Sequence, residues 1–163
     1  MRAMTRNLTR PRTRSDCKAC ALSVVCSTIM GNMETKKKLL LVEDDVALSS
    51  VYRSRMELEG FEVQEVNNGE DALSAAQSFK PDLILLDAMM PKISGFDVLD
   101  ILRNTPDTAD IRIIMLTALS QPKVKERAEA LGVDDYLVKS QVVIGDVVER
   151  VKYHLGMLEK PAE

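Results

Sequence analysis

The sequence predicts an α/β fold in which five parallel strands alternate with five helices. Residues 83–86 (Leu-Ile-Leu-Leu) form an uninterrupted apolar run, which is typical of a strand buried on both faces of a sheet. Four other short apolar or alternating runs are separated from it by segments with the apolar spacing of helices. Polar residues follow these strands where open α/β sheets place their ligands, at the carboxyl ends. Such alternation implies right-handed crossovers, with helices on both faces of the sheet.

The first half of the pattern begins with an apolar run over residues 38–43 that leads into Glu43-Asp44-Asp45. Residues 46–59 have helical spacing, and Gly60 is placed to end that helix in the left-handed conformation. Residues 61–66 alternate with period two, as expected of a half-covered edge strand. The turn at 67–69 then leads into a helix over residues 70–79. The apolar residues that give the first helix its spacing are Val46, Leu48, Val51, Met56 and Leu58.

The second half begins with the buried strand, which ends at Asp87, and Pro91 and Gly95 mark the loop beyond it. The remaining elements are predicted as a helix over 96–103, a strand over 111–117, a helix over 122–131, a strand over 135–139 and a helix over 144–155. Because the second strand is the most amphipathic, we place it at an edge. The predicted architecture is a flavodoxin-like, doubly wound sheet with strand order 2-1-3-4-5.

Charge divides the chain into two parts. Residues 1–33 carry a net charge of +5 and the remainder −8, which gives −3 for the 163 residues. We expect residues 34–157 to form one domain and residues 158–163 a short tail. The acidic body argues against nucleic acid as a main partner. No apolar run approaches the ~18 residues of a membrane span, so we expect no membrane partner.

The first 33 residues are interpreted as a disordered leader or as the product of a misassigned start upstream of Met33. All three cysteines lie there, and Cys17, Cys20 and Cys26 make an incomplete zinc site or incidental thiols. A body without cysteine suits a reducing compartment, so we expect a cytoplasmic protein.

Five polar residues at the strand ends can act together: Asp44, Asp45, Asp87, Thr117 and Lys139. Converging carboxylates repel one another, and a hard divalent ion such as Mg²⁺ relieves that repulsion. A carboxylate nucleophile with a metal, an ammonium and a hydroxyl forms a phosphoryl-transfer site. Taken singly, each residue has another explanation: Asp44 or Asp45 can cap the first helix, Thr117 can bond the backbone, and Lys139 can be a solvated lysine. Their joint placement favours the phosphoryl-transfer site.

These residues also carry a family resemblance. The matching segments are Leu41-Val-Glu-Asp-Asp45, Asp87-Ala-Met-Met-Pro91 with Gly95, Thr117-Ala118 and Tyr136-Leu-Val-Lys139. Together, from about residue 37 to 155, they resemble the receiver domain of bacterial two-component response regulators, in particular the stand-alone receivers of chemotaxis.

The resemblance implies that Asp87 accepts a phosphoryl group from a phosphohistidine on a sensor histidine kinase or a histidine phosphotransfer protein. It also implies that Asp45, Asp87 and the main-chain carbonyl of Met89 bind Mg²⁺, and that Asp44 reaches the ion through water. Thr117 and Lys139 would hold the phosphoryl oxygens.

Tyr136 would be the switch aromatic, turning inward as Thr117 moves toward the phosphoryl group. Phosphorylation would then change the face formed by the fourth helix, the fifth strand and the fifth helix. Only eight residues follow residue 155, so we expect the output to be contact with a downstream protein, or a phosphorylation-dependent homodimer.

The implied activity is self-phosphorylation and dephosphorylation without turnover of a separate substrate, so we do not expect an enzyme. Alternatives are a phosphorelay intermediate that passes the group to a downstream histidine, and a scaffold that works without phosphorylation. A phosphatase of the haloacid dehalogenase type would need an acid where this chain has Met89.

Two departures from the family pattern stand out. Ser140 follows Lys139 where the family usually has proline. Met89 and Leu119 are apolar at positions where polar residues would orient an attacking water, and we hypothesise slow self-dephosphorylation.

Overall fold

A computed structural model of the chain describes residues 36–159. The interpretations of residues 1–33, their cysteines included, and most of the predicted tail lie outside this part. The described strands are β1 (Lys38–Val42), β2 (Glu62–Val66), β3 (Leu83–Asp87), β4 (Arg112–Thr117) and β5 (Asp135–Val138). They form one sheet in the order β2-β1-β3-β4-β5, and every neighbouring pair is parallel. The predicted fold class and strand order are confirmed.

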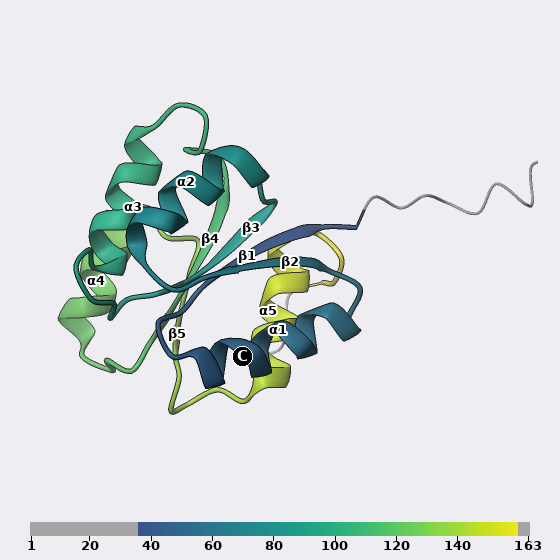
Figure 1. Cartoon of the computed structure of the whole chain (residues 1–163). Coiled ribbons are helices and arrows are strands. Elements are labelled where there is room, and N and C mark those ends of the chain that lie inside the picture. The colour runs from purple at the N-terminus through teal and green to yellow at the C-terminus, as the bar shows by residue number, and fades with distance from the viewer. Residues whose placement is uncertain (1–35, 160–163) are drawn as a thin grey trace, which may run out of the picture. The chain divides into compact units, whose positions relative to one another are not determined.

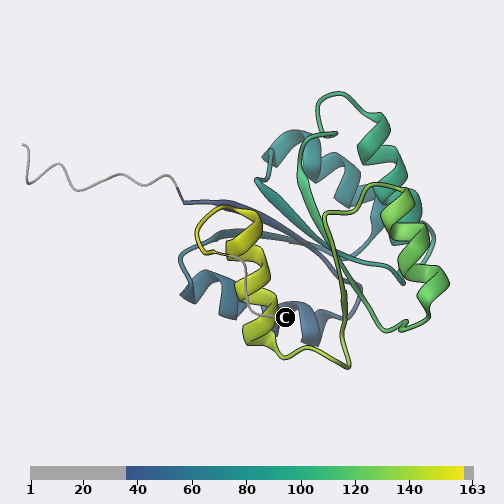
Figure 2. The ribbon, with the colours of Figure 1, turned by 180° about the vertical axis from the view of Figure 1, so that it is seen from behind.

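Five helices cover this sheet from both sides: α1 (Val46–Leu58), α2 (Gly69–Phe79), α3 (Gly95–Asn104), α4 (Pro122–Ala130) and α5 (Ile144–His154). Helices α1 and α5 lie on one face, and α2, α3 and α4 lie on the other (Figure 1; Figure 2, from behind). Within residues 36–159, no helix has both the length and the hydrophobicity needed to cross a membrane.

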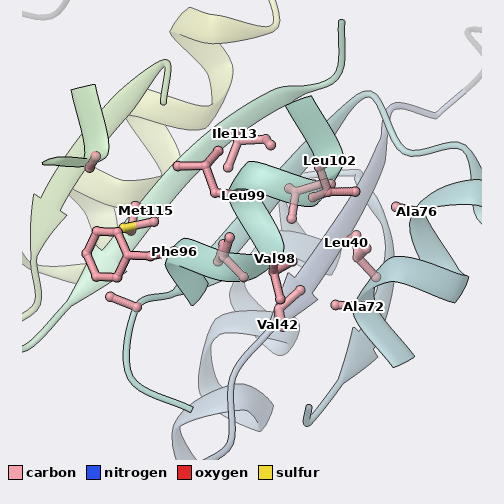
Figure 3. Packing of buried hydrophobic residues seen from close by; sticks show 14 of the residues in the cluster. Leu40, Val42, Ala72, Ala76, Phe96, Val98, Leu99, Leu102, Ile113 and Met115 are labelled. Carbon is pink, nitrogen blue, oxygen red and sulfur yellow. The ribbon is translucent and has the colours of Figure 1, made fainter. Parts of the chain in front are cut away.

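The core consists of two apolar clusters, one on each face of the sheet. On the α2–α4 side, Phe96, Leu99 and Leu102 of α3 pack over alternate residues of β1, β3 and β4 (Figure 3). On the α1–α5 side, the other residues of these strands meet Met56 of α1 and Val148 of α5. The apolar run at residues 83–86 of β3 is fully buried, as the sequence predicted. Its alternate residues point to opposite faces of the sheet, so that they belong to different clusters. Each Å² of apolar surface buried in these clusters stabilises the folded domain by about 25 cal/mol.

Helix α1 buries a face that its apolar spacing does not mark. Its buried residues are Ser49, Tyr52 and Met56, whereas Val46 is 64% and Leu58 82% exposed. Of the five apolar residues that indicated this helix, Met56 alone is fully buried. The apolar residues of α1 do not form one stripe, so the packing against β1 and α5 selects the inner face instead.

Candidate functional site

The carboxyl ends of β1, β3, β4 and β5 bring four polar residues to one edge of the sheet. Asp87 and Thr117 are the last residues of β3 and β4, and Glu43 and Lys139 directly follow β1 and β5. The amide of Lys139 donates to the carbonyl of Thr117 over 2.7 Å, which fixes where the lysine leaves the sheet. The expected convergence of Asp87, Thr117 and Lys139 on this edge is therefore present in the fold.

Lys139 connects two buried carboxylates at the centre of this edge. Its ammonium nitrogen Nζ lies 2.7 Å from Oδ2 of Asp87 and 2.7 Å from both carboxylate oxygens of Glu43. Asp87 is 4% and Glu43 2% exposed. Burial works to lower the pKa of Lys139, but its hydrogen bonds with Asp87 and Glu43 and their negative charges outweigh it, and the pKa lies above its usual value. Lys139 is therefore a fixed positive charge beside the expected phosphoacceptor.

Glu43 is the site residue that the sequence analysis did not assign. Burial raises its pKa from 4.5 to about 7; the hydrogen bond from Lys139 opposes this shift, and the charge of Asp87 adds to it. A carboxylate that resists ionisation, beside another carboxylate, is suited to a site that receives further positive charge.

Three acids come close enough to share a cation: Glu43, Asp44 and Asp87. One carboxylate oxygen from each lies within 4.8 Å of the others, and Asp44 is exposed while the other two are buried. Such oxygen donors fit a hard divalent ion such as Mg²⁺, which usually takes one or two carboxylates and keeps several waters. Glu43, Asp44 and Asp87 would hold the ion in this arrangement.

Asp45 lies elsewhere, which corrects one expectation. It is the N-cap of α1, and its Oδ1 accepts hydrogen bonds from the amides of Ala47 (2.9 Å) and Leu48 (3.2 Å). This carboxylate is not in the group of three acids, whose first members are Glu43 and Asp44. The acids of the site are therefore the first two residues of Glu43-Asp44-Asp45, whereas we expected the last two. The capping role that we left open for Asp44 or Asp45 falls to Asp45.

The loop after β3 wraps closely around Asp87. The amide of Met89 donates to Oδ1 of Asp87 over 2.9 Å, and the amide of Gly95 donates to the carbonyl of Ala88 over 3.1 Å. A Cβ atom on Gly95 would lie 2.0 Å from the carbonyl oxygen of Asp87, so no larger residue fits this approach. The main-chain carbonyl of Met89, expected to bind Mg²⁺, belongs to this loop, and its role stays a prediction.

Thr117 and Tyr136 meet at Leu119 in the loop after β4. Thr117 is fully buried, and its hydroxyl accepts a hydrogen bond from the amide of Leu119 over 3.0 Å. The hydroxyl of Tyr136 donates to the carbonyl of Leu119 over 2.8 Å. The two residues expected to form the switch are thus joined through one backbone unit. Whether Tyr136 moves on phosphorylation stays a prediction.

An aspartate paired with a lysine at the carboxyl end of the third strand of a doubly wound sheet is suited to accept a phosphoryl group. Comparison with known families agrees. Residues 39–152 match the model of the response regulator receiver domain, and the chain belongs to this family. The resemblance found in the sequence is therefore confirmed.

Solved structures and curated proteins support this membership. The chain is similar to the receiver domain of Francisella response regulator 1452 (28% identity, TM-score 0.69, 74% of this chain and 98% of that one). It is also similar to the chemotaxis response regulator CheY4 of Vibrio cholerae (27% identity, TM-score 0.69, 74% of this chain and 99% of that one).

Among curated proteins, the chain is 41% identical over 102 residues to the DNA-binding dual master transcriptional regulator RpaA of Synechocystis, which is 63% of this chain and 42% of that protein. It is 43% identical over 102 residues to the phosphate regulon transcriptional regulatory protein PhoB of Rhizobium meliloti, 63% of this chain and 45% of that protein. The matched region spans less than half the length of these relatives.

These relatives overturn one expectation drawn from charge. The acidic body led us to exclude nucleic acid as a partner, yet RpaA is described as DNA-binding and PhoB as a transcriptional regulator. The exclusion was wrong because the net charge was counted over residues 34–163, and the relatives extend well beyond the region that matches this chain. This charge carries no information on contacts made through the other half of such a regulator.

Proposed function

We propose that this domain takes a phosphoryl group from a phosphohistidine onto Asp87 and that Mg²⁺ is required for the transfer. The observation that carries this proposal is the ion pair between Lys139 and Asp87, 2.7 Å long and buried at the carboxyl end of β3. A nucleophilic carboxylate held beside a fixed ammonium, with two further acids able to share a cation, has the components that phosphoryl transfer requires.

The transfer follows from the residues around Asp87. A carboxylate oxygen of Asp87 attacks the phosphorus, the P–N bond to the donor imidazole breaks, and the electron pair of that bond returns to the imidazole nitrogen. The ammonium of Lys139 offsets charge on the phosphoryl oxygens, and the hydroxyl of Thr117 donates a hydrogen bond to one of them. Glu43, Asp44 and Asp87 would hold Mg²⁺, and the ion would supply positive charge that offsets the negative charge of the phosphoryl oxygens.

The product is an acyl phosphate on the domain itself, so we propose signalling rather than turnover of a separate substrate. Hydrolysis of the acyl phosphate returns Asp87 to its carboxylate form and resets the domain. We propose a sensor histidine kinase or a histidine phosphotransfer protein as the donor, because the chain belongs to the receiver family of response regulators.

Intact-mass measurement tests the proposal directly. The full chain is incubated with Mg²⁺ and either phosphoramidate, a small P–N donor, or acetyl phosphate. We expect the addition of one phosphoryl group, absent from Asp87→Ala and from a sample with EDTA. Asp45→Asn is the matched control, because it changes a neighbouring acid that caps a helix, and it should be modified like the wild type. Addition that survives Asp87→Ala would refute the assignment of the acceptor.

The curated relatives suggest one class of output. RpaA and PhoB are transcriptional regulators, so we propose control of transcription as an output to be tested. Gel-shift titration with genomic DNA fragments, with and without phosphoramidate, tests this output. The salt concentration is kept the same in both titrations, because the affinity of a protein for DNA depends strongly on salt.

A further inference from the structure

Helix α4 packs against the domain through few residues, and its one fully buried residue, Ala128, lies near its C-terminal end. Val124 in its first half and Leu131 beyond its end pack partly buried against the core. The guanidinium of Arg127 lies 4.8 Å from the ring centre of Phe96 in α3. The helix lies at the outer margin of its layer (Figures 1 and 2). Few apolar contacts therefore resist its movement.

Arg103 of α3 clamps the turn that follows α4. Its Nε donates to the carbonyl of Gly132 and its Nη2 to Oδ2 of Asp134, each over 2.8 Å. Its Nη1 donates to the carbonyls of Ala109 (2.8 Å) and Ile111 (2.7 Å). The side chains of Arg103 and Asp134 are 19% and 15% exposed. Shielded, charge-assisted hydrogen bonds of this kind are among the stronger polar contacts.

Asp134 extends the clamp to β4. Its Oδ2 also accepts the amide of Ile113 over 2.9 Å, and its Oδ1 pairs with Arg112 over 2.7 Å. Gly132, at φ +83°, turns the chain between α4 and this carboxylate in a conformation that suits glycine. The C-terminal end of α4 is thus tied to α3 and to the start of β4, at the edge of the sheet remote from Asp87.

The N-terminal end of α4 has a different attachment. Gln121 makes no side-chain capping bond, and Pro122 at the helix start has no amide hydrogen to donate. In the preceding loop, Leu119 is held by the hydroxyl groups of Thr117 and Tyr136. Both hydroxyls belong to residues at or beside the phosphoryl site. This end of α4 is therefore held by groups that phosphorylation would disturb.

We propose that the turn at residues 132–134, fixed by Arg103, is the fulcrum on which α4 pivots when Asp87 is phosphorylated. This rests on the proposed function. When Thr117 engages the phosphoryl group, the support of Leu119 changes and the start of α4 moves, while Arg103 and Asp134 hold its end. Arg103 is a positioning residue: it touches no reacting atom, and it confines the conformational change to residues 118–126.

Amide hydrogen exchange of the full chain, with Mg²⁺ and with or without beryllofluoride as the phosphoryl analogue, tests the fulcrum. In the wild type we expect exchange over residues 118–126 to change about fivefold or more, the low end of ordinary coupling between sites, while residues 131–138 stay unchanged. In Arg103→Lys, which keeps the charge but loses the planar fork, the change should spread into residues 131–138. Arg112→Met is the matched control, because Arg112 is 56% exposed and, among residues 36–159, its side chain pairs with the same carboxylate alone.

Each other outcome has a defined meaning. A wild-type response that already includes residues 131–138, or an Arg103→Lys response equal to that of the wild type, would overturn the fulcrum. So would protection around Asp87 without any change over 118–126, and this result would leave the proposed function standing. No response anywhere, together with no phosphoryl addition by mass, would refute the proposed function and the fulcrum with it. An Arg103→Ala variant that is unfolded does not replace Arg103→Lys, whose folding is checked by circular dichroism.

Discussion

Glu43 and Lys139 are 96 residues apart in the chain, yet both oxygens of the Glu43 carboxylate lie 2.7 Å from the Lys139 ammonium. Glu43 directly precedes the two aspartates of Glu43-Asp44-Asp45, so the acids that face the site begin one residue earlier than expected. The electrostatics of the site therefore depend on a glutamate whose pKa burial raises to about 7.

Mg²⁺ affinity should rise with pH up to about 7 and then level off. Below that pH, Glu43 is protonated in the folded domain and must release its proton when the ion binds, which costs about tenfold in affinity per pH unit. Calorimetric titration measures this, since the chain has no tryptophan to report binding. Glu43→Gln should flatten the profile; a variant profile as steep as that of the wild type would contradict the role of Glu43.

The same group makes stability depend on pH when Mg²⁺ is absent. Glu43 has a pKa of about 7 in the folded state against 4.5 as its ordinary value, so the folded state binds the proton more tightly. Its contribution to the free energy of unfolding is fully present below pH 4.5 and is lost as the pH rises through about 7. Urea unfolding at pH 5 and pH 8 should show a smaller difference for Glu43→Gln than for the wild type.

Asp44 and Asp45 should respond differently to the same substitution. Asp44→Asn removes a carboxylate from the group of three acids and should weaken Mg²⁺ binding about tenfold or more. Asp45→Asn should leave it unchanged, because asparagine is an equally good N-cap. Asp45→Ala should instead cost about 1 kcal/mol of stability. Equal loss of Mg²⁺ affinity in Asp44→Asn and Asp45→Asn would show that the one-residue shift is incorrect.

Gly95 should tolerate no side chain. Gly95→Ala places a Cβ atom 2.0 Å from the carbonyl oxygen of Asp87, so the loop must move, and we expect a loss of about 3 kcal/mol or more. Gly145→Ala in α5 is the matched control, with no atom within 4 Å of its new Cβ, and it should stabilise the domain by about 0.5–1 kcal/mol. Thermal unfolding followed by circular dichroism compares them, and a neutral Gly95→Ala would disprove the close approach.

The phosphoryl group on Asp87 should be long-lived. Met89 is 55% exposed beside the site, and neither Met89 nor Leu119 offers a polar side-chain atom to orient water. The double variant Met89→Asn with Leu119→Glu should shorten the half-life about tenfold or more, the low end of what a positioned general base contributes. Decay of the phosphorylated mass after removal of the donor measures it. An unchanged half-life would disprove the hypothesis.

Much of this molecule could be predicted from its sequence because each strand carries an unbroken or alternating apolar pattern. The pattern gave the strand order and located Asp87, Thr117 and Lys139 at strand ends. Two features depend on packing that the apolar pattern does not record. The inner face of α1 includes Ser49, which is polar, and the side-chain directions after β1 assign Glu43 to the site and Asp45 to the helix cap. Asp45 stands directly before the helix start, which is a usual N-cap signal, but its placement with the other strand-end residues led us to prefer a role in the site.

The span of the Lys139 contacts has a consequence for synthesis of the chain. Lys139 reaches Asp87 across 52 residues and Glu43 across 96, so the site requires β1, β3 and β5 to be in place together. Contacts of such sequence separation form late, after the intervening loops have closed. A nascent or truncated chain that lacks β5 has Asp87 and Glu43 without their ammonium partner, so the site is complete only after β5 has joined the sheet.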